Sequence, residues 1–269
     1  MHTSPKPQLQ ATPAAYQALT AWYETPLGQH LLSEERRLVD QALQRRFGYQ
    51  LLQLGCADLL LHEASPMGHK FSFCPYAGVS QRHPAVARGE AIPLANDSVD
   101  LVLLHHALDF STHPHQLLRE AARVLIAGGH LVIAGFNPLS AWGLRNRWHR
   151  GREGDSPWAA ALLGPARVSD WLSLLDFQVE SIHYGVHVPP VNAERAIRYS
   201  RWLETLANRF NWPTGALYLI TACKRVLPLT PVQLQWRSPP LGLPLAEVNG
   251  CRGVAARERA ANDRDLHEG

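Results

Sequence analysis

Apolar residues gather in short blocks along this chain, and one block is regular enough to predict two strands and a helix. The residues from Val99 to Leu104 form an apolar run apart from Asp100. Polar residues bound this run, with Asn96-Asp97-Ser98 before it and His105-His106 after it. A short run that lacks polar alternation is typical of a strand covered on both faces. We therefore predict a buried strand that ends at a pair of histidines.

A helix and a second buried strand are predicted to follow. Pro114 suits the first turn of a helix, and Gly128-Gly129 suits its end. The apolar residues between them fall on one helix face: Leu117, Leu118, Ala121, Val124 and Leu125. The next strand is then His130–Phe136. A strand, a crossover helix and a strand form a parallel unit, and ligands bind at the carboxyl ends of its strands. The candidate site residues at these ends are His105, His106, Asp109 and Asn137.

Helical and strand-like segments alternate along the rest of the chain. The further predicted elements are helices at Ser33–Phe47, Val168–Leu175 and Asn192–Phe210, and strands at Tyr49–Leu54, Lys70–Cys74, Gln178–Val188 and Gly215–Lys224. This alternation predicts a doubly wound α/β domain. We place the domain at residues 31–225, after an N-terminal extension at 1–30. Proline, glycine and balanced charge dominate from Val226, so we expect residues 226–269 to be a disordered tail.

Composition narrows the function classes only slightly. The chain of 269 residues is 46% hydrophobic, which is enough for one good core. Its formal net charge is +3 without a block of lysine and arginine, so nucleic acid is not indicated. The four cysteines are scattered without CxxC spacing, which argues against a structural zinc site or a disulfide framework. Because we find neither a secretory signal nor an apolar run of about 20 residues, we expect a cytoplasmic protein without a membrane span.

Three segments resemble the class I S-adenosylmethionine-dependent methyltransferases of the type 11 group. They are LLQLGC, EAIPLANDSVDLVLLHHALDFSTHP and LREAARVLIAGGHLVIAGFNP, and they follow the family order from about Gln50 to Pro138. Two more segments, ETPLGQHLL and GFNPLSAWGLR, resemble a small proteobacterial branch of that group. The resemblance implies a Rossmann-like, doubly wound sheet of seven strands, mostly parallel with an antiparallel last strand. It also implies S-adenosylmethionine as the cofactor.

The family pattern implies where this chain contacts the cofactor. The contacts fall at the end of the first strand and its turn, at the position of the pair that usually faces adenine, and at the end of the strand before the two histidines: Gln53, Gly55, Cys56, Ala57, Arg88, Gly89, Glu90 and His105. Gly55 matches the first glycine of the family's turn, a position where any side chain would block the ligand. Gln53 stands where the family usually has an acid, and Ala57 and Leu59 stand where it usually has glycines. Residues 64–89 contain no Asp or Glu, so the carboxylate that usually holds the ribose is missing.

His106 and Asp109 match a histidine and an acid that the family carries just after the fourth strand. A histidine suits a general base near neutral pH. The resemblance therefore implies His106 as the catalytic residue, which would line the cofactor–acceptor cleft together with His105. The alternative is that both histidines only cap the strand end and bond backbone groups.

Two other features carry weaker signals. His113-Pro114-His115 has no third ligand at a fitting spacing, so we predict no metal site. The segment from Leu139 to Trp158 mixes tryptophans with arginines. It either stacks on a flat or anionic acceptor or covers an edge of the core. Residues 139–160 and 189–213 are the predicted lid or insert segments.

Two functions from different classes stay open. The first is a methyltransferase that acts on an unidentified small-molecule acceptor, with RNA as a less favoured acceptor. The second is a non-catalytic scaffold or regulatory protein that keeps the fold but has a degenerate cofactor pocket. A nicotinamide-dependent reductase is disfavoured because a GxGxxG turn is absent. We favour the enzyme, because the segment Glu90–Pro138 keeps the family pattern throughout. The oligomeric state is not predicted.

Overall fold

The computed structural model describes residues 13–56, 58–77, 85–144, 162–187 and 212–225. Contacts divide the chain into two units, residues 1–227 and 228–269, and every described residue belongs to the first unit. The predicted helix Asn192–Phe210 and the predicted tail lie outside the described residues, as does most of both predicted lid segments. None of the described helices is long and apolar enough to cross a bilayer.

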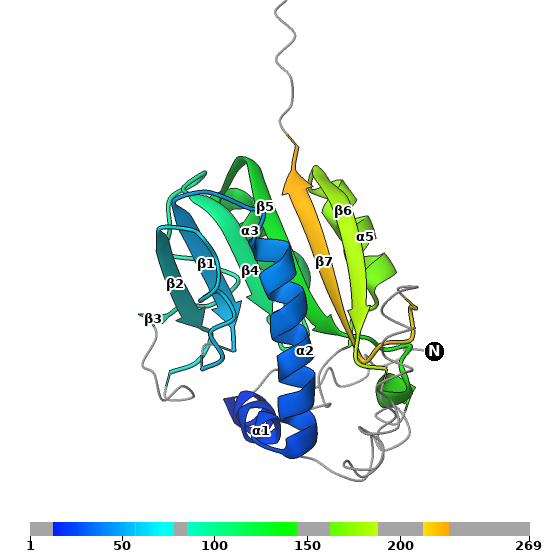
Figure 1. The fold of residues 1–269 in the computed structure, drawn as a ribbon. Coiled ribbons are helices and arrows are strands. Elements are labelled where there is room, and N and C mark those ends of the chain that lie inside the picture. Colours follow the sequence, from blue (N-terminus) through cyan, green and yellow to red (C-terminus); the bar gives the residue numbers. More distant parts are fainter. Residues whose placement is uncertain (1–12, 57, 78–84, 145–161, 188–211, 226–269) are drawn as a thin grey trace, which may run out of the picture. The chain divides into compact units, whose positions relative to one another are not determined.

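One sheet of seven strands forms the framework of the first unit (Figure 1). Its strands are β1 (Gln50–Gly55), β2 (His69–Cys74), β3 (Ala85–Val86), β4 (Val99–His105), β5 (Leu125–Phe136), β6 (Phe177–Gly185) and β7 (Leu217–Lys224). They lie in the order β3-β2-β1-β4-β5-β7-β6. The neighbouring pairs from β3 to β5 are parallel, whereas β7 is antiparallel to β5 and to β6. The predicted sheet, with its antiparallel last strand, is confirmed.

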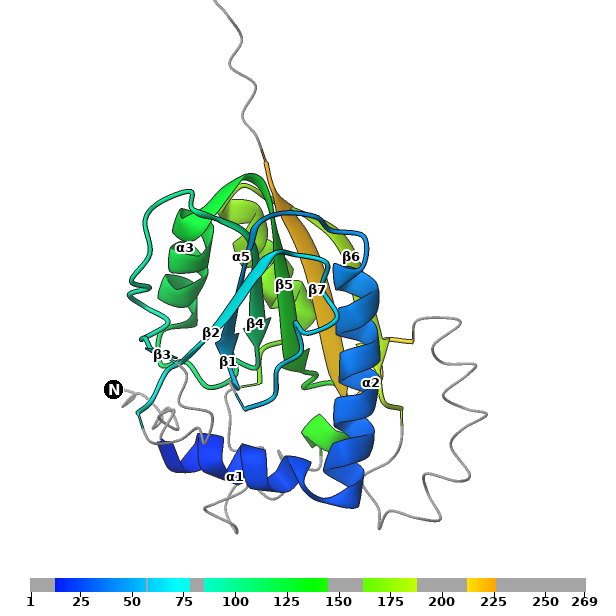
Figure 2. The same cartoon turned by 60° about the vertical axis from the view of Figure 1, so that its left-hand side comes forward.

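Helices cover both faces of this sheet. The described helices are α1 (Pro13–Tyr23), α2 (Pro26–Leu43), α3 (Pro114–Val124) and α5 (Pro165–Leu174). α2 lies against one face, and α3 and α5 lie against the other (Figures 1 and 2). Leu101 and Leu103 of β4 belong to the hydrophobic cluster that includes α2, and Val102 and Leu104 belong to the cluster on the opposite face. The apolar run from Val99 to Leu104 is therefore covered on both faces, as predicted.

A tight corner joins α1 to α2. The hydroxyl of Thr25 accepts a hydrogen bond from the N–H of Gly28 at 3.1 Å, and Pro26 is the first residue of α2. A Cβ at Gly28 would lie 2.2 Å from the carbonyl oxygen of Trp22, so only glycine allows this close approach. The corner lays α1 across the carboxyl ends of β1 and β4 (Figure 2).

Two predicted boundaries differ from the structure. The predicted domain start at residue 31 falls inside α2, which begins before the predicted helix at Ser33. α3 ends at Val124 instead of at Gly128-Gly129, and the two glycines lie in β5 where its pairing with β4 is irregular. The prediction that these glycines end the helix was wrong, because hydrogen bonds from distant parts of the chain end it earlier.

Candidate active site at the strand ends

β1 ends in a sharp turn at Gly55. The φ angle of Gly55 is +118°, a value that side-chain-bearing residues rarely adopt. A Cβ at this position would lie 2.0 Å from the carbonyl oxygen of His105 in β4. The N–H of Cys56 donates to the same oxygen at 3.4 Å. The turn therefore joins the carboxyl ends of two central parallel strands, where sheets of this kind bind ligands.

The side chain of Gln53 holds the segment that follows this turn. It is fully buried, and its amide nitrogen donates to the carbonyl oxygens of Cys56 at 3.1 Å and Leu59 at 2.7 Å. Its amide oxygen accepts from the N–H of Leu61 at 3.1 Å and lies 2.8 Å from Nδ1 of His62. The hydrogen-bonding capacity of the amide is thereby used within the protein. Gln53 shapes the loop rather than offering its side chain to a ligand.

A buried polar cluster lies at the end of β4. Its members are Tyr23 of α1, Glu35 of α2, and His105, His106 and Asp109, and each is at most 2% exposed. We call it the strand-end cluster. Nδ1 of His106 lies 2.9 Å from Oδ2 of Asp109, and Nε2 lies 3.0 Å from the Tyr23 hydroxyl. That hydroxyl donates to Oε2 of Glu35 at 3.0 Å. The other carboxylate oxygen, Oε1, lies 3.3 Å from Nε2 of His105 and 3.2 Å from Nε2 of His106.

β5 fixes the position of His106. The φ angle of His106 is +52°, which is uncommon for a residue other than glycine. Its N–H donates to the carbonyl oxygen of Ala134 at 3.0 Å, and its ring stacks on Phe136 with 3.8 Å between centroids. The N–H of Phe136 also donates to Oδ2 of Asp109 at 3.0 Å. Unusual backbone angles held by surrounding structure are typical of functional sites.

Burial and charge oppose each other in the strand-end cluster. Burial alone would lower the pKa of His106, but Glu35 and Asp109 raise it to about 9. Burial alone would raise the pKa of Glu35, but the two histidines hold it well below its usual range. Burial raises the pKa of Asp109, although His106 and the N–H of Phe136 oppose this shift. In this arrangement His106 is an imidazolium at neutral pH, and both of its ring nitrogens have partners.

The predicted cofactor residues after β3 contact a different part of the fold. A Cβ at the buried Gly89 would lie 2.7 Å from the side chain of Leu117. Oε1 of Glu90 accepts from the Ser111 hydroxyl at 3.1 Å, and Arg88 is exposed. Gly89 and Glu90 therefore contact α3 and the segment before it.

The predicted residues at the ends of β1 and β4 do meet. Nδ1 of His105 lies 3.4 Å from the carbonyl oxygen of Cys56, whose side chain is buried in the core. Ala57 lies outside the described residues. The structure thus brings Gly55, Cys56 and His105 together, beside the catalytic candidate His106.

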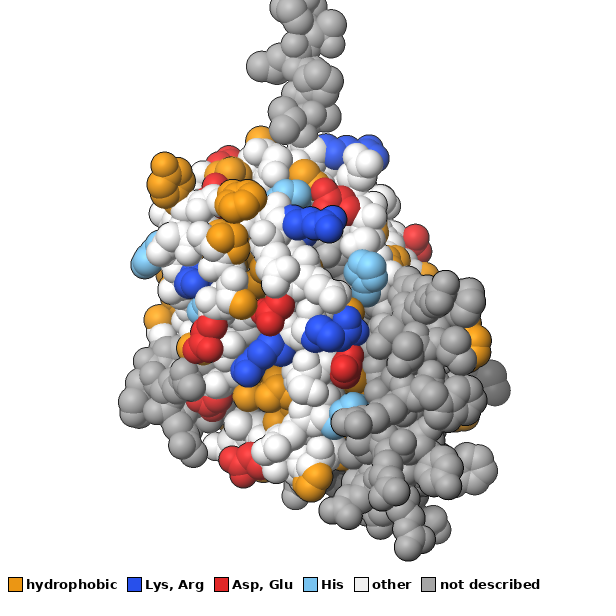
Figure 3. Space-filling model, viewed as in Figure 1, with side chains coloured by type: hydrophobic (Ala, Val, Ile, Leu, Met, Phe, Trp, Pro, Cys, Tyr) orange, Lys and Arg blue, Asp and Glu red, His pale blue; other side chains and the backbone are white. Residues whose placement is uncertain are grey.

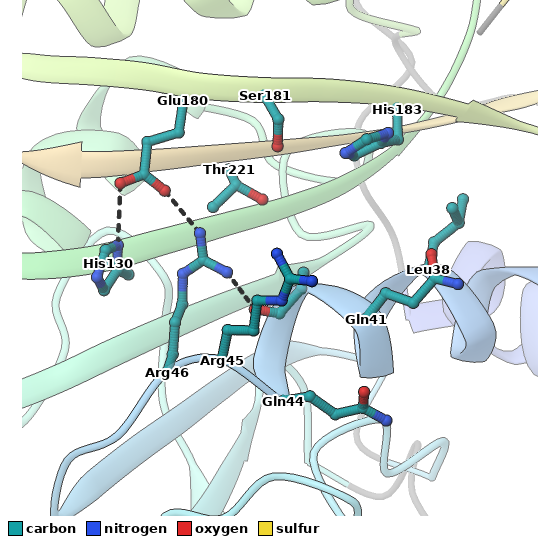
Figure 4. A pocket seen from close by; sticks show the side chains of 11 residues that line it. Leu38, Gln41, Gln44, Arg45, Arg46, His130, Glu180, Ser181, His183 and Thr221 are labelled. Atoms are coloured by element: carbon teal, nitrogen blue, oxygen red, sulfur yellow. Dashed lines mark hydrogen bonds and ion pairs between the residues drawn. The ribbon is translucent and has the colours of Figure 1, made fainter. Parts of the chain in front are cut away.

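Two hollows lie on opposite ends of α2. One of about 530 Å³ is walled by α1, α2 and the segment after β1, and Tyr23 connects it to the strand-end cluster. The other, of about 650 Å³, is lined by the end of α2 and by β5, β6 and β7 (Figure 4). There Arg46 donates to Glu180 at 2.6 Å, and Nδ1 of His130 lies 3.8 Å from the same carboxylate. Because His130 lies nearer the start of β5 than its end, this second hollow is away from the carboxyl ends of the strands.

Comparison with known proteins decides the family. The methyltransferase domain family matches residues 69–133. The uncharacterized protein YafS of Escherichia coli K12 is 32% identical over 246 residues, which span 89% of this chain and 96% of YafS. The chain belongs to the class I S-adenosylmethionine-dependent methyltransferases.

Shorter and more distant similarities agree with this family. The malonyl-[acyl-carrier protein] O-methyltransferase of Hahella chejuensis is 31% identical over 93 residues, or 35% of this chain and 33% of that enzyme. A solved methyltransferase of Thermotoga maritima, described as a possible histamine N-methyltransferase, has a TM-score of 0.58 at 16% identity. It covers 78% of this chain and 98% of its own. At that identity the likeness supports the fold alone.

Among the described residues, main-chain groups suit the binding of the family's cofactor better than side chains do. The missing side chain of Gly55 lets the turn approach the carbonyl of His105, at the end of β1 where the family pattern implies the cofactor turn. β2 ends at Cys74-Pro75-Tyr76, and residues 64–89 contain no carboxylate for the ribose. The Tyr76 ring packs edge-on against Tyr16 of α1, with 5.5 Å between centroids. Binding would therefore depend on backbone groups of the turn and on the polar groups of Tyr76 and Glu90.

Tyr23 and Glu35 belong to the strand-end cluster but were not among the residues predicted from the sequence. Glu35 occupies the apolar face of α2, between Leu31 and Leu38, and all three side chains are buried. A charged residue on an apolar helix face was the available signal. For Tyr23 there is no local signal, because only the corner between α1 and α2 brings it to the histidines.

Two other predicted features have structural roles. The side-chain nitrogen of Asn137 donates to the carbonyl oxygens of Pro213 and Gly215, each at 2.8 Å, so Asn137 fastens the chain before β7. Trp142 is buried and packs against Trp22 of α1, with 6.1 Å between ring centroids. For Trp142 the packing alternative is confirmed, while the rest of the tryptophan and arginine segment lies outside the described residues.

Proposed function

We propose that this protein transfers the methyl group of S-adenosylmethionine to a small-molecule acceptor. The observation that carries the proposal is the contact between Gly55 and the carbonyl of His105. It supports a cofactor turn beside the strand-end cluster, because the turn after β1 and the end of β4 meet at this point. Bound S-adenosylmethionine supplies a methyl group that is already activated. The protein then has to hold the acceptor in line and exclude water.

On the cofactor side, we assign the residues implied by the family pattern: Gln53, Gly55, Cys56, Ala57, Arg88, Gly89, Glu90 and His105. Their roles follow from their surroundings. Gln53 holds the loop, and Gly55 lets the turn approach the His105 carbonyl. Glu90 is half-buried and close enough to Tyr76 that, together with burial, its charge raises the pKa of that phenol. It is the carboxylate available to bind a polar group of the cofactor near this edge of the sheet.

On the acceptor side, we assign His106, oriented by Asp109. The Tyr23 hydroxyl now occupies the place that a hydroxyl or amine of an acceptor would take, between Nε2 of His106 and Oε2 of Glu35. Because the raised pKa keeps His106 protonated at neutral pH, Tyr23 has to move and His106 has to release its own proton before it can act as a general base. Since α1 carries Tyr23, we propose that a shift of α1 admits the acceptor.

The surroundings of the strand-end cluster favour a small molecule over RNA. The cluster is buried beneath α1 and α2, which leaves no broad surface for a polymer. On the face shown in Figure 3, acidic and basic side chains of the described residues are interspersed rather than gathered in one patch. Together with a net charge of only +3, the absence of a basic patch among the described residues on this face favours a small molecule over RNA.

A non-catalytic scaffold or regulatory protein is the second candidate. Two observations favour it: the lack of Asp and Glu in residues 64–89, and the use of the whole Gln53 amide within the protein. Either would weaken a pocket that binds the cofactor by side chains. We rank it second because the turn at Gly55 binds through main-chain groups, which these changes leave in place.

Calorimetric titration with S-adenosylmethionine and S-adenosylhomocysteine separates the two candidates. We expect both ligands to bind the full chain with one site. The absence of heat at millimolar ligand, with a chain that is folded by circular dichroism, would reject the enzyme and favour the scaffold.

The role of His106 can be tested independently of cofactor binding. We expect His106→Asn to retain cofactor affinity and to lower methyl transfer by roughly a hundredfold or more. Asn is preferred to Ala because it tolerates the left-handed backbone of this position. His183→Ala is the matched control, because His183 is an exposed histidine that lines the distant hollow. Unchanged turnover in His106→Asn would contradict the assignment.

A further inference from the structure

Three nitrogen and oxygen atoms of the strand-end cluster converge on one point. They are Nε2 of His105, Nε2 of His106 and Oε1 of Glu35, and they all lie within 4.8 Å of one another. We propose that these atoms form a binding site for a divalent transition-metal ion of the Zn²⁺ type. Two imidazoles and one carboxylate are a donor set that such ions prefer, whereas Mg²⁺ prefers oxygen ligands alone.

The two distances from Glu35 to the histidines suit tetrahedral coordination. With metal–ligand bonds of about 2.0–2.1 Å, neighbouring ligand atoms of a tetrahedral zinc site lie about 3.3 Å apart. The distances from Oε1 of Glu35 are 3.3 Å to His105 and 3.2 Å to His106. A hydrogen bond between a charged imidazole and a carboxylate would be shorter, at about 2.7–2.9 Å.

Two of these donor atoms lack a hydrogen-bond partner. Oε1 of Glu35 and Nε2 of His105 are fully buried, and neither makes a hydrogen bond within the described residues. Buried polar atoms without partners are rare and destabilising. A cation between the three side chains would satisfy both atoms at once.

The far side of each imidazole is arranged as in metal sites. Nδ1 of His106 lies 2.9 Å from Oδ2 of Asp109, and Nδ1 of His105 lies 3.4 Å from the carbonyl oxygen of Cys56. Metal-binding histidines usually donate this second N–H to a carboxylate or a carbonyl, which turns the other nitrogen toward the ion. The carboxylates of Glu35 and Asp109 together balance the charge of one divalent ion.

The remaining coordination position lies beside Tyr23. Its hydroxyl is 3.0 Å from Nε2 of His106 and 3.0 Å from Oε2 of Glu35. Catalytic zinc sites keep such a position for water or substrate. With an ion bound, His106 would be a ligand and not a free base, and the ion would supply Lewis-acid polarisation of a molecule that replaces Tyr23.

The competing explanation of the same geometry is an ion pair between protonated His106 and Glu35. It requires no metal, and it leaves His105 without a hydrogen bond at Nε2. Measuring the metal content of the protein separates the two explanations.

The full chain is purified without chelators, and its metal content is measured by inductively coupled plasma mass spectrometry. It is then stripped with EDTA and titrated with Zn²⁺, Co²⁺ and Mg²⁺, both as the native protein and during refolding, because the ligands are buried. We expect one Zn²⁺ or Co²⁺ per chain and no binding of Mg²⁺. Because metal binding is measured without S-adenosylmethionine, its outcome is independent of the proposed methyl transfer.

Matched variants locate the ion. A second group of possible ligands exists at the distant hollow, formed by His130, Glu180 and Cys223. We expect Glu35→Gln to weaken binding by roughly a hundredfold, and Glu180→Gln, which removes the same charge from the other group, to leave it unchanged. The visible spectrum of the Co²⁺ protein gives an answer without variants, because a site with Cys223 would show sulfur-to-metal charge transfer and the strand-end cluster would not. No stoichiometric ion, or loss of the ion in Glu180→Gln alone, would overturn the proposal.

Discussion

At the scale of single residues, Gly55 carries two constraints at once, a φ of +118° and the close approach to the His105 carbonyl. We expect Gly55→Ala to lower the free energy of unfolding by about 3 kcal/mol, because the new methyl group meets a main-chain oxygen that cannot easily move. Urea denaturation followed by circular dichroism measures this loss. Gly68→Ala is the control, since a Cβ there would lie 3.9 Å from its nearest neighbour. Similar losses in both variants would contradict the explanation.

Gln53 offers a second test at this scale. Gln53→Glu replaces the amide by the acid that the family usually carries, but its oxygens would face the carbonyls of Cys56 and Leu59. We expect a loss of about 2–4 kcal/mol at neutral pH. Burial would raise the pKa of the new carboxyl in the folded state, so the loss should grow as pH rises above about 4 and shrink in acid. Unfolding curves at several pH values measure it.

The matched control for this charge change is Gln41→Glu, which places the same new carboxyl on an exposed position of α2. We expect it to change stability by less than about 0.5 kcal/mol at every pH. A Gln53→Glu protein as stable as this control would show that the loop does not depend on the two donated hydrogen bonds.

Which site residues the sequence predicts depends on how local their signal is. His105, His106 and Asp109 follow an apolar run, and that run alone places them at a strand end. Glu35 joins them only through the packing of α2 on the sheet. No spacing along the chain connects a residue of α2 with the end of β4. The prediction of no metal site rested on residues that are close together in the sequence. It therefore did not include the combination of Glu35 with His105 and His106.

At the scale of elements, the end of α3 depends on Lys224 of β7. Its ammonium group donates to the carbonyl oxygens of Ala122 and Leu125 and pairs with Asp97 at 2.8 Å. We expect Lys224→Met to lower stability by about 1–2 kcal/mol, because it leaves these carbonyls without a partner. Thermal unfolding measures the change. Arg37→Met, which breaks an exposed pair with Glu34, should cost less than about 0.5 kcal/mol, and an equal effect would argue against a role in ending the helix.

The same helix end shows why element boundaries are hard to predict. Gly128-Gly129 has the composition of a helix end, and Gly128 does adopt a φ of +79°. Gly128 adopts this conformation inside β5, at the point where the pairing of β5 with β4 shifts register. Apolar runs predict the existence of the strands because both faces of the sheet are buried. The boundary depends on which distant donor reaches the last carbonyls, and the local sequence does not contain that information.

At the scale of the whole molecule, the order of elements predicts the sheet because parallel strands joined by crossover helices allow few arrangements. The prediction omits α1, although Tyr16, Leu19 and Tyr23 recur at helical spacing and are all buried. A helix of 11 residues is marginal in isolation and needs a partner surface. That surface is made by α2, by Phe110 after β4 and by Tyr76 after β2. α1 is therefore a consequence of the assembled fold.

If α1 belongs to the core, a cavity beneath α1 should lower the stability of the whole unit. Leu19 is fully buried in the same hydrophobic cluster as β1 and β4. We expect Leu19→Ala to lower the free energy of unfolding by about 2–4 kcal/mol in a single transition, and Gln17→Ala on the exposed face of α1 to have little effect. Denaturant unfolding followed by far-UV circular dichroism and by tryptophan fluorescence tests whether the transitions coincide.

A separate early transition, or no loss in Leu19→Ala, would mean that α1 opens without the sheet. The two outcomes bear on how the acceptor enters. A detachable α1 could carry Tyr23 away from His106 at little cost and leave the core intact. A fully cooperative α1 would restrict the opening to a local shift around the corner at Gly28, whose contact with the Trp22 carbonyl leaves little room for bending. The unfolding data would then limit the proposed movement to the last turn of α1, which carries Tyr23.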